Sequence, residues 1–87
     1  MPIEVRKPTP EQEAAIRTCP IWEKEPSTFP WHYDEQETCL ILEGDVQVRA
    51  ADETVSFGPG DYVVFPQGLD CVWTITKAVR KHYRFGD

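Results

Sequence analysis

Two short segments of the sequence carry side chains that could bind or transform a small molecule. Trp31 and Tyr33 alternate in the first segment, and Glu37 and Cys39 follow at the same two-residue spacing. Side chains two positions apart in a β-strand point to the same face, and the same rule brings residues 71 and 73 together. Aromatic walls with a few polar groups are typical of small-molecule pockets. We therefore predict one interior pocket lined by six residues: Trp31, Tyr33, Glu37, Cys39, Cys71 and Trp73.

Glu37 and Cys71 are the candidate catalytic residues of this pocket. A carboxylic acid between aromatic rings could serve as a general acid or base, or it could be a buried carboxylate held by Tyr33 or by backbone amides. A cysteine could be a nucleophile or ligate a soft metal, and Cys39 and Cys71 could form a disulfide if their strands are neighbours. Buried cysteines also act as small apolar fillers. The sequence leaves these alternatives open.

Cations gather in the last segment, residues 79–85, where Lys81 lies on one face of the alternating pattern and His82 on the other. This strand could reach the pocket mouth, so Lys81 and His82 are candidate ligand-binding residues. The cations could form a stripe that binds an anionic ligand, or they could pair with acidic residues on the surface. Trp22 is expected to pack in the core or against a second copy of the chain.

The elements that must position these residues are short strands and one short helix. Thr9, Pro10 and Gln12 predict a capped helix start, and Pro20 ends that helix by about Cys19. From residue 21 onward the pattern has a period of two, broken by Gly, Pro and acidic turns, including a tight hairpin at 43–45. The predicted strands are 21–25, 28–33, 37–43, 45–50, 53–57, 61–65, 71–76 and 78–85.

This pattern predicts an all-β fold, a small antiparallel jelly-roll barrel formed by residues 20–87 as a single domain. Residues 1–19 form an N-terminal segment that carries the short helix. Short antiparallel strands protect their edges by curling into a barrel or jelly roll. The segment 37–42 is largely apolar on both faces, so one face should line the barrel and the other should pack on a second layer or a partner subunit.

Two stretches have the spacing of a known family. Six residues separate Glu37 from Gly44, which resembles the end of the first cupin motif, and the stretch from Gly60 through Pro66 and Gly68 resembles the scaffold of the second. With Leu-Glu-Gly at 42–44, Gly-Pro-Gly-Asp at 58–61 and Phe-Pro-Gln-Gly at 65–68, the chain resembles small single-domain cupins. These are related to the ethanolamine-utilisation and ureidoglycine-aminohydrolase cupins. The resemblance implies a jelly-roll barrel with an internal pocket and, as in many such proteins, a homodimer.

In metal-binding cupins, three histidines and a glutamate hold iron, manganese, nickel or a similar ion. The resemblance places Trp31, Tyr33 and Cys71 in the histidine positions and keeps only Glu37. Trp cannot ligate a metal, because its indole nitrogen is only a donor. A divalent metal (Mn, Fe, Ni or Zn) could still be held by Glu37 and Cys71 with either Tyr33 or His32; a metal-free pocket is the alternative. The register that turns Trp31 and Tyr33 inward turns His32 outward.

Composition limits the partners. The chain has 87 residues and a net charge of −6, which disfavours nucleic acid. Its apolar runs are far shorter than the roughly 18 residues that span a bilayer, and its polar start does not resemble a signal peptide. Three cysteines without a C-x-x-C pair fit a reducing compartment. We expect a cytoplasmic protein that binds a small molecule and no membrane.

Three functions of different classes fit this sequence. The first is an enzyme acting on a small metabolite, with Glu37 as acid or base and Cys71 or a divalent metal as the second group. The second is a metal-free binding or sensor module, in which the aromatic residues hold a ligand that is not transformed. The third is a structural accessory protein with a filled barrel. The fold alone does not separate them.

Overall fold

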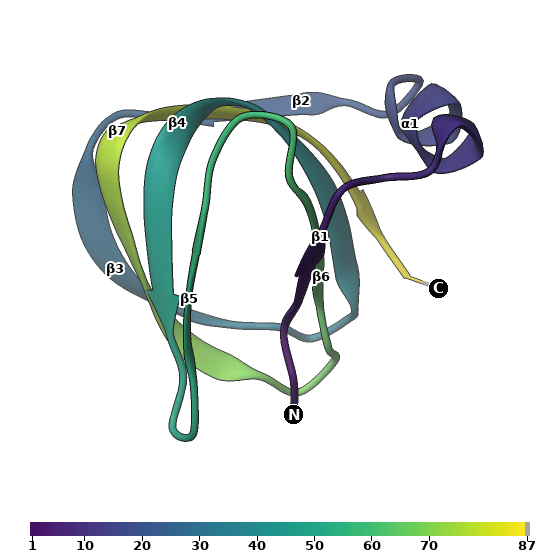
Figure 1. The fold of residues 1–87 in the computed structure, drawn as a ribbon. Coiled ribbons are helices and arrows are strands. Elements are labelled where there is room, and N and C mark those ends of the chain that lie inside the picture. Colours follow the sequence, from purple (N-terminus) through teal and green to yellow (C-terminus); the bar gives the residue numbers. More distant parts are fainter. Residues whose placement is uncertain (87) are drawn as a thin grey trace.

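Seven antiparallel strands curl into a barrel, and one short helix lies outside its wall (Figure 1). The computed structural model describes residues 1–86. The elements are β1 (Glu4–Arg6), α1 (Pro10–Ile16), β2 (Ile21–Lys24), β3 (Ser27–His32), β4 (Glu37–Arg49), β5 (Thr54–Phe57), β6 (Tyr62–Phe65) and β7 (Asp70–Phe85). The strand order is β1-β6-β4-β7-β2, with β3 paired to β7 and β5 paired to β4. The predicted all-β barrel with a short N-terminal helix is confirmed.

Two long strands, β4 and β7, form the centre of the sheet and pair along nearly their whole length, from Glu37 opposite Phe85 to Arg49 opposite Val72. The predicted hairpin at 43–45 and the predicted break at residue 77 are both wrong, because each strand continues through these positions. Register shifts mark the stretch between Ile41 and residue 46. The glycine there therefore bends a continuous strand and does not reverse the chain.

Gly44 explains how the bend is made. Its φ is +117°, and a Cβ built there would lie 2.7 Å from the Val79 Cα atom of β7. Glycine adopts positive φ without steric cost and lets two backbones approach closely. The bend is thus fixed by a residue without a side chain, at a point where β4 lies closely against the backbone of its neighbour β7.

The sheet edges are short. β2 pairs with the C-terminal half of β7, and β3 pairs with the N-terminal half of β7. Pro30 lies within β3, opposite Val72, and is exposed. Proline lacks a backbone donor and is tolerated on an edge strand. β1 was not predicted; it is a three-residue edge strand that pairs with β6 and is too short to show a periodic pattern.

The helix begins as the sequence predicts. Thr9 Oγ1 accepts a hydrogen bond from the Gln12 backbone N–H at 3.2 Å, and the Gln12 side chain accepts one from the Thr9 N–H at 3.0 Å. Ile16 at the end of the helix is fully buried against Leu40 of β4 and Tyr62 of β6. The outer apolar face of β4 is therefore covered by α1, which is the predicted second layer.

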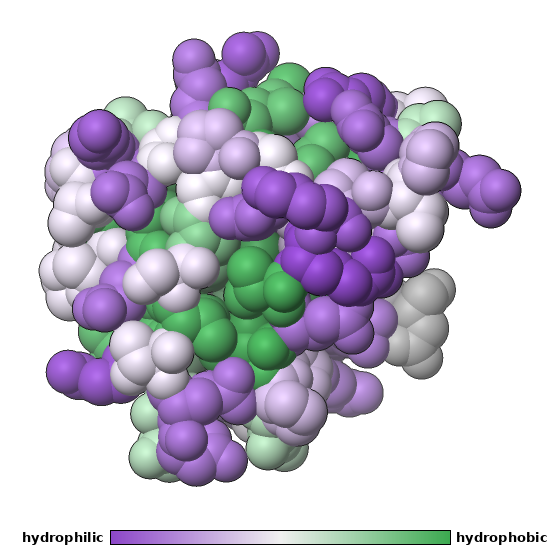
Figure 2. All heavy atoms as spheres, in the orientation of Figure 1, coloured by the Kyte–Doolittle hydropathy of each residue, from purple (hydrophilic) through white to green (hydrophobic). Residues whose placement is uncertain are grey.

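The barrel interior holds the main core. Cys39 and Ile41 of β4 face inward with Trp73 and Ile75 of β7, as the alternation predicts. Apolar side chains also reach the surface in the middle of the face seen in Figure 2, where hydrophilic side chains surround them. The described residues include one helix, of seven residues, and no helix among them is long and apolar enough to cross a membrane.

Candidate functional site

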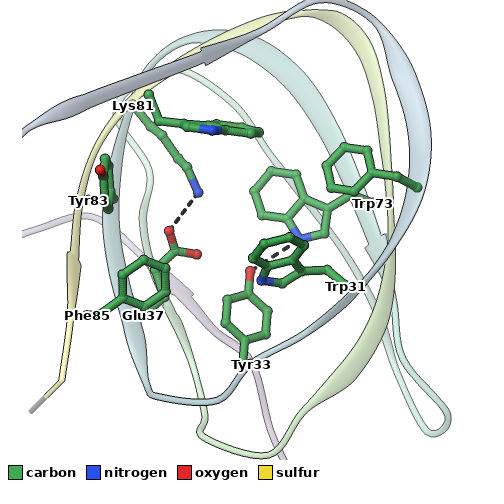
Figure 3. Close-up of a pocket in the computed structure, with 9 residues that line it drawn as sticks. Trp31, Tyr33, Glu37, Trp73, Lys81, Tyr83 and Phe85 are labelled. Atoms are coloured by element: carbon green, nitrogen blue, oxygen red, sulfur yellow. Dashed lines mark hydrogen bonds and ion pairs between the residues drawn. The ribbon is translucent and has the colours of Figure 1, made fainter.

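One end of the barrel interior is not filled by the core and forms a cavity of about 180 Å³. Figure 3 shows its polar floor, where the Glu37 carboxylate and the Lys81 ammonium meet between aromatic side chains. Strands β2, β3, β4 and β7 all contribute to its wall. The lining residues are Trp22, Phe29, Trp31, Tyr33, Glu37, Trp73, Lys81, Tyr83 and Phe85.

A buried ion pair joins two neighbouring strands at the floor of the cavity. Lys81 Nζ lies 2.8 Å from Glu37 Oε2, and each side chain is only 5% exposed. Lys81 is opposite Ile41 in the ladder and Glu37 is opposite Phe85, so the long lysine side chain reaches along the strands to the carboxylate. Both charges are largely buried, so the attraction between them is stronger than that of an exposed pair.

Two indole rings enclose the ammonium from the sides. Lys81 Nζ lies 4.9 Å from the ring centroid of Trp22 and 4.6 Å from that of Trp73, distances at which a cation is attracted to an aromatic face. Trp22 stands directly opposite Lys81 in the ladder between β2 and β7, which places the two side chains together. The cation is therefore held by one carboxylate and two aromatic rings.

The ion pair does not use its full hydrogen-bonding capacity. Among residues 1–86, the bond from Lys81 is the one hydrogen bond to the Glu37 side chain, and it is also the one that the ammonium donates. A carboxylate accepts about four hydrogen bonds and an ammonium donates three. Both groups border the cavity, so a molecule inside it could accept from Lys81 and donate to Glu37.

The aromatic wall is closely packed on one side and open on the other. The Trp73 indole N–H donates to the Tyr33 hydroxyl at 3.2 Å, and the Tyr33 ring stacks on Phe65 with centroids 4.9 Å apart. Trp31 and Phe85 are 48% and 44% exposed and form the mouth. Burial, and next the negative charge of Glu37, raise the pKa of Tyr33, so its hydroxyl keeps its proton at neutral pH.

The two candidate cysteines lie beside the cavity and do not line it. Cys39 is fully buried, and its thiol donates a weak hydrogen bond to the Val63 carbonyl; the Cys71 thiol donates one to the Trp31 carbonyl, each at 3.7 Å. Burial raises the pKa of Cys39 to about 12 and that of Cys71 to about 11. Neither thiol is poised as a thiolate nucleophile at neutral pH. Both cysteines are free, with no disulfide between them.

The predicted metal ligands are not brought together. His32 is exposed and points away from the cavity, with its Nδ1 atom 2.7 Å from Asp70 Oδ1 and its Nε2 atom 3.6 Å from Asp34 Oδ1. Within residues 1–86 no cluster of three His, Cys, Asp or Glu side chains is close enough to hold a metal ion. Of the predicted ligands, only Glu37 reaches the cavity, and its charge is already balanced by an ammonium.

The donor set therefore does not fit a metal. The motif positions that are histidines in metal-binding cupins hold an indole, a phenol and a thiol, and the indole cannot ligate a metal because its nitrogen is only a donor. The Lys81 ammonium supplies the positive charge next to the carboxylate.

Lys81 and His82, the two candidate ligand-binding residues of the last strand, point to different faces of the sheet. Lys81 faces the cavity, whereas His82 faces the helix side and donates from Nδ1 to the Cys19 carbonyl at 2.9 Å. Sequence reasoning did not assign Trp22, Phe29, Tyr83 or Phe85 to the site. Tyr83 and Phe85 share a face with Lys81 in the alternating pattern, which was a usable signal. Trp22 and Phe29 needed the register of β2 and β3 against β7.

A family model described as an EutQ-like cupin domain matches residues 11–83 of this sequence. The chain belongs to the EutQ-like cupin family. A solved structure of a DUF861 family protein from Thermotoga maritima is 47% identical to this cupin, with a TM-score of 0.90, and the alignment covers 97% of this chain and 99% of that one.

More distant structures share the fold of this cupin. The EutQ protein of Clostridium difficile is 20% identical, with a TM-score of 0.70, and the match covers 76% of this chain and 52% of that chain. A putative ethanolamine utilization protein Q from Salmonella typhimurium is 22% identical, with a TM-score of 0.69, and the match covers 97% and 68%. No curated protein matches the sequence. These matches establish the cupin fold and support no specific activity.

Proposed function

We propose that this cupin binds a small organic molecule, without a metal, in the cavity above the Lys81–Glu37 pair. The ligand has a flat apolar body and a polar edge that both accepts and donates a hydrogen bond, as a carboxamide does. The observation that carries the proposal is the hydrogen-bonding capacity that this buried pair leaves unused inside an aromatic cavity. Convergent polar groups in an aromatic pocket are the usual means of orienting a ligand.

The size of the cavity limits the ligand. A closed apolar cavity of about 150 Å³ holds one benzene molecule, and this cavity is about 180 Å³ with an open mouth. A single ring fits inside, and its substituents extend toward Trp31 and Phe85. The ring is expected to lie against the indole and phenyl faces of the wall, because aromatic pairs gain about 0.5–1.5 kcal/mol beyond burial.

Benzamide is a suitable first probe, because its carbonyl can accept from Lys81 and its amide N–H can donate to Glu37. Binding is measured by nuclear magnetic resonance of the three indole N–H signals and by tryptophan fluorescence. We expect the signals of Trp22, Trp31 and Trp73, all of which line the cavity, to shift and saturate. Absence of any saturable shift at solubility-limited benzamide would refute the proposal.

A matched pair of variants identifies the polar contact. Glu37→Gln removes the charge but keeps the shape, and we expect it to weaken benzamide at least about tenfold, since a hydrogen bond to a charged group contributes about 1.5–3 kcal/mol. Glu13→Gln makes the same change in a surface ion pair on α1 and should leave the affinity unchanged. Equal affinities for both variants would show that the carboxylate does not contact the ligand.

A further inference from the structure

We propose that this pocket captures small aldehydes and ketones as an imine on Lys81, with Glu37 carrying the protons. The inference deepens the proposed function and rests on it, since the carbonyl compound must first enter the same cavity. The floor of the cavity indicates this substrate class, because it places a primary amine, with a proton acceptor in contact, at the end of an aromatic pocket. A lysine amine that is desolvated in an apolar pocket can act as a nucleophile toward a carbonyl carbon once it has lost its proton.

The environment of Lys81 differs from that of the other lysines. Its ammonium is 2.8 Å from a carboxylate oxygen, lies within 4.9 Å of two indole centroids, and is part of a side chain that is 5% exposed. Lys7 pairs with Asp61 but its side chain is 72% exposed, and Lys77 is exposed. Lys24 is half-buried and lies over the Phe29 ring. Of these lysines, Lys81 alone combines enclosure with a partner that can take its proton.

The proton path needs no group outside the pair. The ammonium first passes a proton to the Glu37 carboxylate, which leaves a neutral amine with a free electron pair. That pair forms the bond to the carbonyl carbon while the electrons of the C=O π bond move to oxygen. Glu37 returns its proton to that oxygen, and the nitrogen then gives Glu37 a second proton.

Loss of water completes the exchange. Glu37 protonates the hydroxyl, the C–O bond breaks, and the nitrogen electrons form the C=N bond. The sum is one ammonium and one carbonyl compound giving one iminium and one water, with no oxidant or reductant. The product carries the same single positive charge as the lysine it replaces. The iminium therefore stays beside the carboxylate and between the indole rings of Trp22 and Trp73.

The cavity selects among carbonyl compounds by shape. Its aromatic wall and volume of about 180 Å³ favour one flat apolar group attached to the carbonyl carbon, and its mouth at Trp31 and Phe85 releases the water. A strongly hydrated or branched sugar would lose its hydration without replacement partners on the wall. Small aromatic or unsaturated aldehydes and ketones are the class that fits.

Benzaldehyde tests the proposal, with borohydride added to reduce the imine to a stable benzyl amine. The site of the added benzyl group is read by mass spectrometry of peptides from the full chain. We expect labelling at Lys81 at least about tenfold faster than at Lys77 or Lys24, and general acid–base catalysis implies a loss of about a hundredfold in Glu37→Gln. Lys81→Arg should lose this label while the exposed lysines keep theirs.

A measurement on the unchanged protein guards against variants that fold poorly. Benzamide has the same ring but forms no imine, so it should slow labelling of Lys81 and leave Lys77 unaffected. If benzamide binds and Lys81 is labelled no faster than Lys77, the imine proposal is overturned and the binding function stands. If Lys81 is labelled selectively but benzamide does not bind, the imine proposal stands and reversible amide binding is refuted. If neither occurs, both fail.

Discussion

The burial of the Lys81–Glu37 pair predicts a large loss of folding stability when one partner is removed. Replacing Lys81 by Met keeps an unbranched side chain of similar length and removes the charge, which leaves the Glu37 carboxylate at 5% exposure without its hydrogen-bond donor. Breaking a buried ion pair by removing one partner costs about 3–5 kcal/mol. Since small domains are stable by only about 5–15 kcal/mol, this single change should remove a large part of the total.

A surface ion pair of the same chain is a matched control, because it has the same N–O distance as the Lys81–Glu37 pair but is exposed. Arg17 Nη2 lies 2.8 Å from Glu13 Oε2 on the surface of α1, with side chains 50% and 44% exposed. Exposed pairs four residues apart on a helix contribute only about 0.3–0.5 kcal/mol. Arg17→Met should therefore cost less than about 1 kcal/mol, although the ion-pair distance equals that of the buried pair.

A double variant separates the loss of the pair from the burial of a lone charge. Glu37→Leu combined with Lys81→Met replaces both charges by apolar groups, and such replacements are often neutral or stabilising. We expect the double variant to recover most of the stability that Lys81→Met loses.

Urea unfolding followed by tryptophan fluorescence supplies the free energies, with an unchanged m-value as the check that two-state unfolding holds. If Lys81→Met costs no more than Arg17→Met, water in the cavity must solvate the pair, and the expectation drawn from its burial is refuted. If the double variant is as unstable as the single one, the cost lies in packing around Lys81.

Further predictions concern the bend, the thiols and the mouth. Gly44→Ala should cost at least about 2 kcal/mol more than Gly86→Ala in thermal unfolding, because both glycines have positive φ but only the first would bring a Cβ within 3 Å of backbone; equal costs would contradict the close approach. Cys39 and Cys71 should resist iodoacetamide at pH 8 in the native state, and rapid modification there would contradict their burial. Because folding raises the pKa of Cys39 from 9.0 to about 12, the thiol's contribution to stability is complete below pH 9 and is lost as the pH rises toward 12; Cys39→Ala should flatten the unfolding free energy over that range. Trp31→Ala should weaken benzamide about tenfold with little change in urea midpoint, since this residue is 48% exposed; unchanged affinity would remove it from the site.

Much of the fold follows from local rules that the sequence displays. The reciprocal hydrogen bonds between Thr9 and Gln12 are formed by adjacent residues, so a local pattern predicts them correctly. Alternation likewise places Cys39 and Ile41 inside the barrel and Leu40 against the helix. These features depend on the period of the strand and need no knowledge of distant partners.

The error at Gly44 has a different origin. A glycine between two acidic residues has the composition of a hairpin turn, and the same freedom of φ also allows a bend in an unbroken strand. The choice is made by β7, whose backbone at Val79 runs directly past this point. Such a contact between residues 35 positions apart in the sequence leaves no signature in the local pattern.

Part of the cavity lining could be predicted from the sequence. Side chains at 31, 33, 37 and 73 do line one cavity, because two-residue alternation places them on inner faces. The partner of Glu37 was not predicted, since it depends on the register of β4 against β7, which sets Ile41 opposite Lys81. Cys71 also faces inward but packs among the core side chains beside the cavity, a difference that alternation cannot resolve.

Pro30 has a consequence for how this molecule meets others of its kind. It occupies an exposed position in β3, an edge strand that has β7 on one side only. An incoming strand that tried to extend the sheet along β3 would find no N–H to accept from at this residue. The barrel thus carries, next to the mouth of its cavity, a built-in interruption against strand-to-strand aggregation, and the edge can stay open without becoming a template for it.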